Sequence, residues 1–131
     1  MHEASFRIWR PCEVWYCNKD GLAVGVNAGI DVGEQQVWSL AESLEVRSYD
    51  GKVYERVNGT KPGWASYVGR PLVKLDVITV QVDLMHDYPK IKFAVNGVFG
   101  RQYMKLLPDE KIKQLRFVVE TYAKDATVEI I

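Results

Sequence analysis

The sequence of 131 residues holds few side chains of the types that catalysis or metal binding requires. Cys12 and Cys17 lie five positions apart, and the two histidines, His2 and His86, are distant from both in the sequence. Two cysteines do not supply the four ligands of a typical zinc site, and a disulfide across so short a loop would add little stability. We therefore expect free thiols, a reducing compartment and a cytoplasmic protein.

The motifs that mark common active sites are also absent from the sequence. There is no GxGxxG, no P-loop, no GxSxG and no HExxH. A Cys–His nucleophilic pair would need the fold to bring a cysteine to a histidine, which nothing in the sequence indicates. Asp83 and Asp87 could form a carboxylate pair, but Asp83 falls on the polar face of a predicted strand, and acid–base catalysis needs a pocket that shifts one pKa. We predict a non-catalytic protein without a cofactor or a metal.

Aromatic residues are the more informative chemical feature. The chain has 4 Trp, 7 Tyr and 4 Phe. Many of them fall in stretches with the composition of loops: Trp15, Tyr16, Tyr49, Trp64, Tyr67, Tyr88, Tyr103 and Tyr122. Each one alone is better explained by packing beneath its loop. As a set on a rigid scaffold they favour a binding module, because exposed Tyr and Trp bury a large area at a small cost in conformational entropy.

The elements that must position these residues are short strands. Segments 78–84 and 91–96 alternate apolar and polar residues, which is typical of an antiparallel sheet with one buried and one solvated face. Asp50-Gly51 and Asn96-Gly97 tolerate the positive φ that tight hairpin turns need. Further strands are predicted over 6–9, 22–26, 44–49, 52–57, 115–121 and 127–131. Such a series of short strands and turns indicates a β-sandwich or barrel.

One segment has a competing interpretation. Val37, Leu40, Ala41 and Leu44 have helical spacing, and periodicity alone leaves helix and strand open there. A single helical turn is also possible at 111–115. The chain contains no internal repeat and no linker, so we expect a single domain over residues 1–131.

The charge balance excludes some classes of partner. Lys and Arg together number 17, as do Asp and Glu, so the formal net charge is zero. A general nucleic-acid binder would carry an excess of basic residues. The sequence has no apolar run approaching the ~20 residues of a spanning helix, and no secretory signal is visible. We therefore expect neither nucleic acid nor membrane as a partner.

Two strands and the segments around them carry a series of motifs. Asp76–Leu84 is similar to "GDvIGv-x-lDl", with Leu75 in place of the glycine, and Ile91–Gly100 is similar to "isFyvNGv-x-xG". The accompanying segments are Leu22–Val26, Val37–Leu40, Ser48–Lys52, Ser66–Gly69, Leu115–Val119 and Thr127–Ile130. In this order and spacing the sequence resembles the SPRY domain family over about residues 5–131. The resemblance favours a strand over a helix near residues 38–46.

The resemblance implies an all-β fold, a concanavalin-like jelly-roll sandwich of two antiparallel sheets. It also implies a non-catalytic adaptor whose loops, at one end of the sandwich, bind a protein or a short linear peptide. In family members that grip peptides, a tyrosine beside the DG hairpin and an aromatic residue before the last strand contribute. The matching positions are Tyr49 and Tyr122, the second with tyrosine in place of tryptophan.

The predicted partner-binding residues are Tyr49, Trp64, Tyr67, Arg70 and Tyr122. Arg70 is included because a guanidinium can pair bidentately with a partner carboxylate, the alternative being a pair on its own surface. Two other functions remain open: a lectin-like carbohydrate-binding domain, since jelly-roll sandwiches also host lectins, and a structural domain within an assembly. No acidic cluster spaced for Ca²⁺ supports the lectin. The sequence does not fix the oligomeric state, and we expect a monomer.

Overall fold

Strands that alternate apolar and polar residues direct their apolar side chains to one face of a sheet. Two such sheets can pack together with these apolar faces between them. The computed structural model of the chain describes residues 1–10, 22–28, 42–48, 50–57, 70–85, 88–104, 112–121 and 126–131, together with the backbone of 63–67. Within these ranges, no helix has the length and apolar character needed to cross a bilayer.

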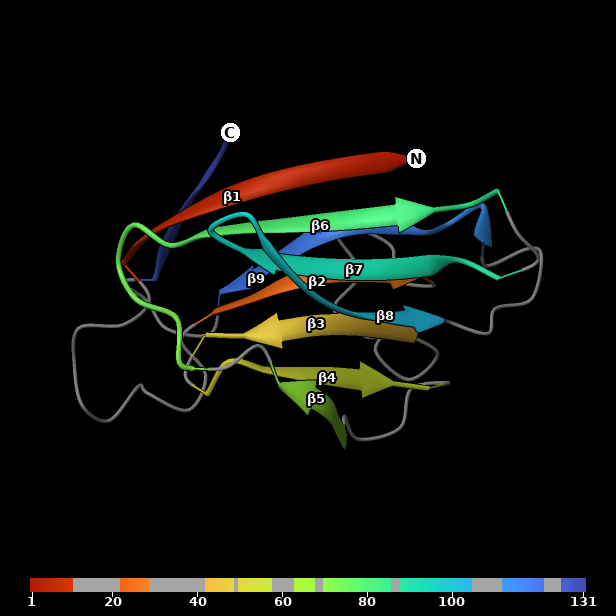
Figure 1. Ribbon diagram of the computed structural model, residues 1–131, viewed down its shortest axis with the longest axis horizontal. Helices are drawn as coiled ribbons and strands as arrows, with labels where there is room; N and C mark the ends of the chain where they lie inside the picture. Colours follow the sequence, from red (N-terminus) through yellow and green to blue (C-terminus); the bar gives the residue numbers. More distant parts are fainter. Residues whose placement is uncertain are drawn as a thin grey trace.

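The described strands form two antiparallel sheets of five strands each (Figure 1). Sheet A has the order β10-β1-β6-β7-β8, and sheet B has the order β5-β4-β3-β2-β9. The strands are β1 His2–Arg10, β2 Leu22–Ala28, β3 Glu42–Arg47, β4 Lys52–Arg56, β5 Gly63–Tyr67, β6 Val77–Asp83, β7 Lys90–Val95, β8 Val98–Met104, β9 Arg116–Thr121 and β10 Thr127–Ile130. This architecture confirms the predicted all-β sandwich of two antiparallel sheets.

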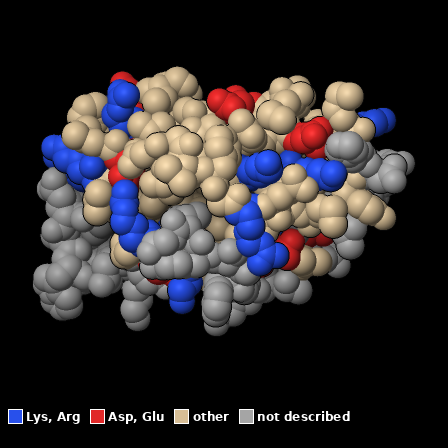
Figure 2. All heavy atoms as spheres, in the orientation of Figure 1, with Lys and Arg blue, Asp and Glu red and all other residues tan. Residues whose placement is uncertain are grey.

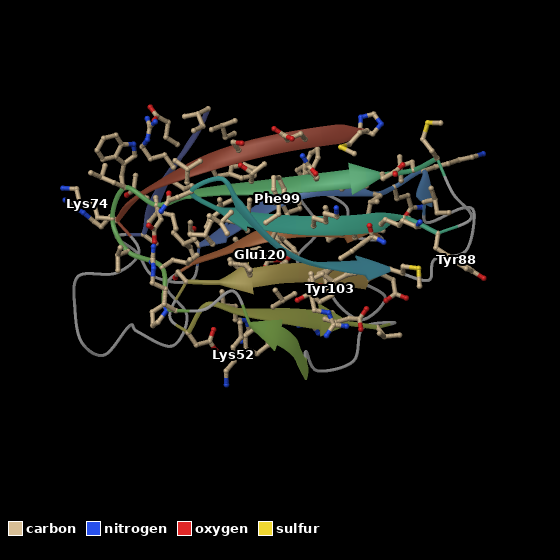
Figure 3. All side chains as sticks on the ribbon, viewed as in Figure 1. Lys52, Lys74, Tyr88, Phe99, Tyr103 and Glu120 are labelled. Atoms are coloured by element: carbon tan, nitrogen blue, oxygen red, sulfur yellow. The ribbon has the colours of Figure 1, made fainter. Side chains whose placement is uncertain are left out.

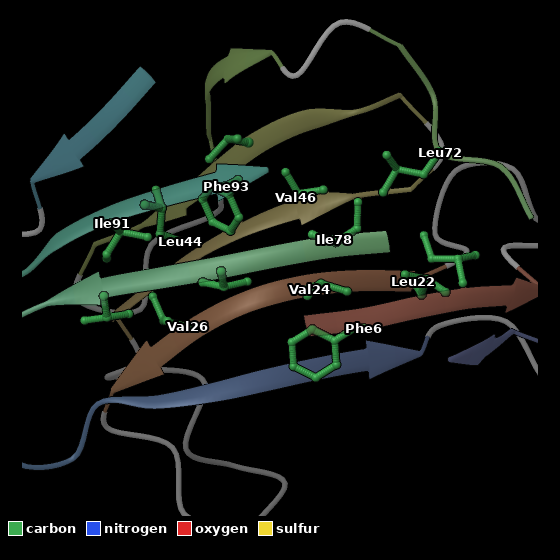
Figure 4. Packing of buried hydrophobic residues seen from close by; sticks show 14 residues of the cluster. Phe6, Leu22, Val24, Val26, Leu44, Val46, Leu72, Ile78, Ile91 and Phe93 are labelled. Carbon is green, nitrogen blue, oxygen red and sulfur yellow. The ribbon is translucent and has the colours of Figure 1, made fainter. Parts of the chain in front are cut away.

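The hydrophobic core lies between the two sheets (Figure 4). In β6, Ile78, Val80 and Val82 are buried and alternate with half-buried neighbours, as the sequence pattern predicts. Burying a side chain of this size stabilises the fold by roughly 1.5–3 kcal/mol. From sheet B, Val24 and Val26 of β2 belong to the same cluster, so the core joins the two sheets.

The central strands of sheet B are buried on both faces. All residues of β2 are buried, and so are all of β3 except Arg47. Gly25 allows the two strands to approach closely, since a Cβ there would lie 2.1 Å from the carbonyl oxygen of Leu44. The face of β3 turned away from the core carries polar side chains, among them the buried Ser43 and Glu45.

Two sequence-based placements need correction. Trp64 and Tyr67, which we expect in a loop, lie on β5, and Tyr103, also expected in a loop, lies on β8. Both strands are at the edge of a sheet, where a strand pairs on one side only. In β8 every residue except Tyr103 is exposed, so its sequence lacks the alternation of apolar and polar residues that predicts a strand. At 42–47, by contrast, the strand favoured by the resemblance is confirmed over the helix.

The zero net charge arises from a mixture of charges. Figure 2 shows Lys and Arg side chains interspersed with Asp and Glu over one face of the sandwich. In the described part of that face no large region carries a single sign, so long-range steering of a charged partner would be weak.

Candidate functional site

Three connections meet at the end of the sandwich where β3 ends and β6 begins, on the left in Figure 1. They are the β3–β4 turn, the segment 70–76 that precedes β6, and the β7–β8 turn. The Leu72 N–H donates to the Ser48 carbonyl at 2.8 Å, which joins the first connection to the second. The Asn96 N–H donates to the Val77 carbonyl at 2.8 Å, which joins the third to the start of β6.

The β3–β4 turn is held by its own polar side chains. The Ser48 hydroxyl accepts from the Leu22 N–H at 3.0 Å, and an Asp50 carboxylate oxygen accepts from the Lys52 N–H at 2.9 Å. The Tyr54 hydroxyl donates to the other carboxylate oxygen of Asp50. Gly51 adopts φ +70°, and a Cβ there would lie 1.9 Å from the carbonyl oxygen of Arg70. The turn therefore requires glycine twice, for its backbone conformation and for its contact with segment 70–76.

The β7–β8 turn is as tight as its sequence predicts. Asn96 and Gly97, its two residues, have φ of 52° and 83°, the positive values of a type I′ hairpin turn. The Asn96 side chain reaches back to β6, because its amide oxygen accepts from the Val77 N–H at 2.8 Å. Its amide nitrogen donates to Asp76 at 3.0 Å.

Asp76 is the centre of this end of the molecule. It is 4% exposed. The Arg70 guanidinium donates to both of its carboxylate oxygens, from Nη1 at 2.7 Å and from Nη2 at 2.9 Å. The Val73 N–H donates to the same carboxylate at 2.8 Å. One carboxylate thus fastens the arginine, the backbone of its own segment and the β7–β8 turn.

These donors determine the charge state of Asp76. The hydrogen bonds from Arg70 lower its pKa to about 2, against the opposing effect of burial, and the Val73 N–H and Asn96 amide add to the lowering. The same pairing raises the pKa of Arg70 above its usual value. The pair is therefore ionised at every physiological pH, and the end of the sandwich is held by a fixed ion pair.

The structure describes the predicted binding residues to different extents. Tyr49 and Tyr122 lie outside the described residues, as do Cys12, Cys17, His86 and Asp87. Trp64 and Tyr67 are described by their backbone on β5, where Tyr67 pairs with Lys52 at the start of β4. Their roles in binding stay predictions.

The described neighbours of Tyr49 and Tyr122 belong to the same end of the sandwich. Ser48 and Asp50 form the β3–β4 turn, and Thr121 ends β9 opposite Leu22, the first residue of β2. The Ser48 N–H donates to the Leu22 carbonyl at 2.9 Å, so the turn and the ends of β2 and β9 adjoin.

Arg70 is the predicted residue whose side chain the structure describes. Its side chain is 48% exposed, and Nη1 also donates to the Pro71 carbonyl at 3.0 Å. A guanidinium has five N–H donors, and these contacts use three. The edge formed by Nε and the second Nη2 hydrogen keeps two donors directed away from Asp76. The pair with Asp76 is the alternative expected from the sequence, in which Arg70 pairs on its own surface. This pair does not use the Nε edge of the guanidinium, which can still bind a partner carboxylate.

Sequence reasoning missed Asp76, Asn96, Ser48 and Asp50 as parts of one site. Their local roles as turn residues and strand starts are visible in the sequence, because Asp, Asn and Ser bond their own neighbouring backbone. Their convergence is not visible, since 28 positions separate Ser48 from Asp76. Within the described ranges, no group of three or more His, Cys, Asp or Glu side chains could hold a metal ion.

The comparisons with known proteins agree with this fold. No family model matches the chain, and no curated protein matches its sequence. Its structure is similar to the crystal structure of the SPRY domain of human HERC1, with a TM-score of 0.60 and 20% sequence identity. The likeness covers 98% of this chain and 72% of that chain. The chain has a SPRY-like fold, which confirms the resemblance seen in its motifs.

Proposed function

We propose that this chain, with its SPRY-like fold, is a non-catalytic interaction module that binds a protein or a short peptide through one end of its sandwich. The binding residues in this proposal are Tyr49, Trp64, Tyr67, Arg70 and Tyr122. We place the module in the cytoplasm, as an adaptor that acts as a monomer. The free thiols expected from the sequence support that compartment.

The observation that carries the proposal is the network around Asp76. Loops bind specifically when a rigid scaffold positions them, because little conformational entropy is then lost on association. Here the ion pair of half-exposed Arg70 with buried Asp76, two backbone donors and a close contact at Gly51 fix the segments next to Tyr49. The residue before Tyr122 is held separately, by the pairing of Thr121 with Leu22. The ordering of the connections at this end of the sandwich supports a role for that end in recognition.

Arg70 gives the proposed partner a chemical feature. Its two remaining donors and half-exposed guanidinium suit a carboxylate of the partner, which would approach the Nε edge while Asp76 holds the other edge. Aromatic side chains nearby would supply the apolar contact. We therefore propose a partner segment that places an acidic residue next to an apolar one.

A comparative affinity purification tests this function. The wild-type chain, Tyr49→Ala/Tyr122→Ala and the control Tyr88→Ala are immobilised in equal folded amounts and exposed to lysate of the native cell. Tyr88 is 45% exposed and lies at the opposite end of the sandwich, on the right in Figure 3. We expect proteins that wild type and Tyr88→Ala recover equally and that the double variant loses, identified by mass spectrometry.

The alternatives give different results in the same design. Equal recovery by all three chains would reject this end as the binding site. A glycan array with hits for wild type, lost in Trp64→Ala, would favour the lectin-like function instead.

A further inference from the structure

A second feature lies at the opposite end of the sandwich, on the right in Figure 1. There the two sheets leave a cavity of about 450 Å³. It lies between the end of β6 in sheet A and the start of β9 in sheet B, next to a turn that the Leu115 N–H closes on the Ile112 carbonyl at 3.2 Å. This volume lies in the range of roughly 300–1,000 Å³ found for small-molecule sites.

The described walls of the cavity are mainly aliphatic and aromatic. They come from β2, β6, the residue after β6, the turn and β9: Val26, Val82, Leu84, Ile112, Leu115 and Phe117. Leu84 is 39% exposed, which is a large apolar exposure for a leucine beside a core. Filling the cavity with an apolar group would remove this surface from water and is therefore favourable.

The polar side chains around this cavity are basic. Lys113 and Arg116 are exposed and line it, and His2 completes the set. Among the described lining residues none is acidic. Neither Lys113 nor His2 makes a hydrogen bond or ion pair within the described structure, and Arg116 donates only to the Gln114 carbonyl, at 3.4 Å. Lys113 and Arg116 thus remain available to an anion.

We propose that this cavity binds an aliphatic carboxylate, a free fatty acid of medium chain length. The alkyl chain occupies the space among Val82, Leu115 and Phe117, and the carboxylate lies beside Lys113 and Arg116. A chain of about ten carbons, each comparable with a water molecule at ~30 Å³, needs about 300 Å³ and fits the cavity. The site is separate from the loop end proposed above for a partner protein, and neither proposal depends on the other.

Isothermal titration calorimetry with decanoate, below its micelle concentration, tests the site. We expect saturable one-to-one binding. Octanoate should bind about 15-fold more weakly, since each buried methylene changes the affinity about fourfold. Decylammonium, with the same chain and the opposite charge, should not bind measurably.

A pair of charge variants tests the role of the cations. Lys113→Glu/Arg116→Glu should weaken decanoate binding about tenfold or more, because charge-assisted hydrogen bonds are lost. The control Lys92→Glu/Arg101→Glu makes the same change in net charge on sheet A, away from the cavity, and should bind as wild type does. Leu84→Gln, at the exposed edge of the apolar wall, should weaken binding without a change of charge.

Amide chemical shifts locate the ligand. Decanoate should shift Val82, Leu115 and Phe117 and leave Asp50 and Arg70 unchanged. The absence of binding, equal binding of decylammonium, or an equal loss in the control variant would overturn the proposal. So would a dimer in sedimentation that Lys113→Glu/Arg116→Glu dissociates, since the cavity would then be an interface between two copies of the chain.

Discussion

Asp76, just before β6, and Glu45, in the middle of β3, are both buried carboxylic acids with neighbours of opposite character. Asp76 is surrounded by donors: the Arg70 guanidinium, the Val73 N–H and the Asn96 amide. Glu45 is 5% exposed and shares a side-chain hydrogen bond with a second carboxylic acid, Glu120. Among the described residues, one of its carboxyl oxygens has no hydrogen-bond partner.

Burial acts to raise the pKa of both groups, and the neighbours decide the net result: donors outweigh burial at Asp76, whereas Glu120 adds to burial at Glu45. Burial raises the pKa of Glu45 well above its usual value, and the charge and hydrogen bond of Glu120 raise it further, while Arg47 and Arg56 act in the opposite direction. The pKa of Asp76 falls to about 2. Asp76 is therefore an anion that holds the loops together, whereas Glu45 is shifted toward its neutral, protonated form within a sheet.

The strand register explains why Glu45 meets an acid. Glu45 lies opposite Gly25, and Glu120 lies opposite Ala23, on the two sides of β2. Glycine and alanine place no long side chain between Glu45 and Glu120, and these two side chains share a hydrogen bond. The comparison shows how a fold can shift similar residues toward different charge states by supplying donors to one and a second carboxylic acid to the other.

The largest expected effect is the loss of Asp76. Asp76→Ala removes the acceptor of the Val73 N–H and of the Asn96 amide and breaks the Arg70 pair. It should lower the free energy of unfolding by about 3 kcal/mol. The matched control is Asp83→Ala at the other end of β6, where the carboxylate accepts from the Met85 N–H; it should cost about 1 kcal/mol or less. Urea denaturation measures both, and equal losses would contradict the special role of Asp76.

The pH dependence of stability sharpens the comparison. The pKa of Asp76 falls from near 3.8 to about 2 on folding, so its stabilisation is present above pH 4 and is lost as the pH falls from about 4 to 2. The loss amounts to about 2 kcal/mol. Denaturation curves at pH 4.5 and pH 2.5 should show it in wild type and not in Asp76→Asn. The same loss in both chains would assign the dependence to other groups.

Glu45 should respond with the opposite sign. Its pKa is raised on folding, so its contribution to stability is complete at low pH and falls as the pH rises above the value of an unfolded glutamic acid. Glu45→Gln supplies a permanent donor to Glu120 and should increase stability at pH 7 by about 1 kcal/mol. Glu55→Gln on the neighbouring β4 is the control and should change stability by less. A decrease in Glu45→Gln would show that the ionised form is the one the fold requires.

The sequence predicts the sandwich, but it predicts only part of the difference between the surroundings of Asp76 and Glu45. Alternation in 78–84 and the Asn96-Gly97 turn predict β6, β7 and the hairpin after β7, because period-two burial and positive φ are local properties. The polar face of β3 is not predictable in the same way. The residues of β3 alternate as in a solvated strand, yet Ser43 and Glu45 are buried, since burial depends on what packs against that face.

The candidate site shows the same limit. Arg70 could be selected from the sequence because it follows an aromatic loop motif, but its partner Asp76 could not. The pair forms because the segment 70–76 folds back on itself, with the Asp76 N–H donating to the Val73 carbonyl at 3.1 Å. Such compact loop geometry depends on several weak preferences acting together, which no single motif encodes.

Leu75, next to Asp76, gives the smallest expected effect and connects the sequence motif to this loop geometry. It has φ 74°, and it stands where SPRY domains have glycine before the aspartate. The left-handed conformation costs a leucine roughly 1–2 kcal/mol, and glycine avoids this cost. About half of the gain is lost again, because glycine has more conformational freedom to lose from the unfolded chain. Because Leu75 is 55% exposed and loses little packing, Leu75→Gly should stabilise the protein by about 0.5 kcal/mol. Val73→Gly, with similar exposure and no positive φ, should instead destabilise it by a similar amount. Thermal denaturation of the two variants separates them by opposite shifts, and a fall in stability of both would mean that the leucine side chain, and not backbone strain, decides the balance at this position.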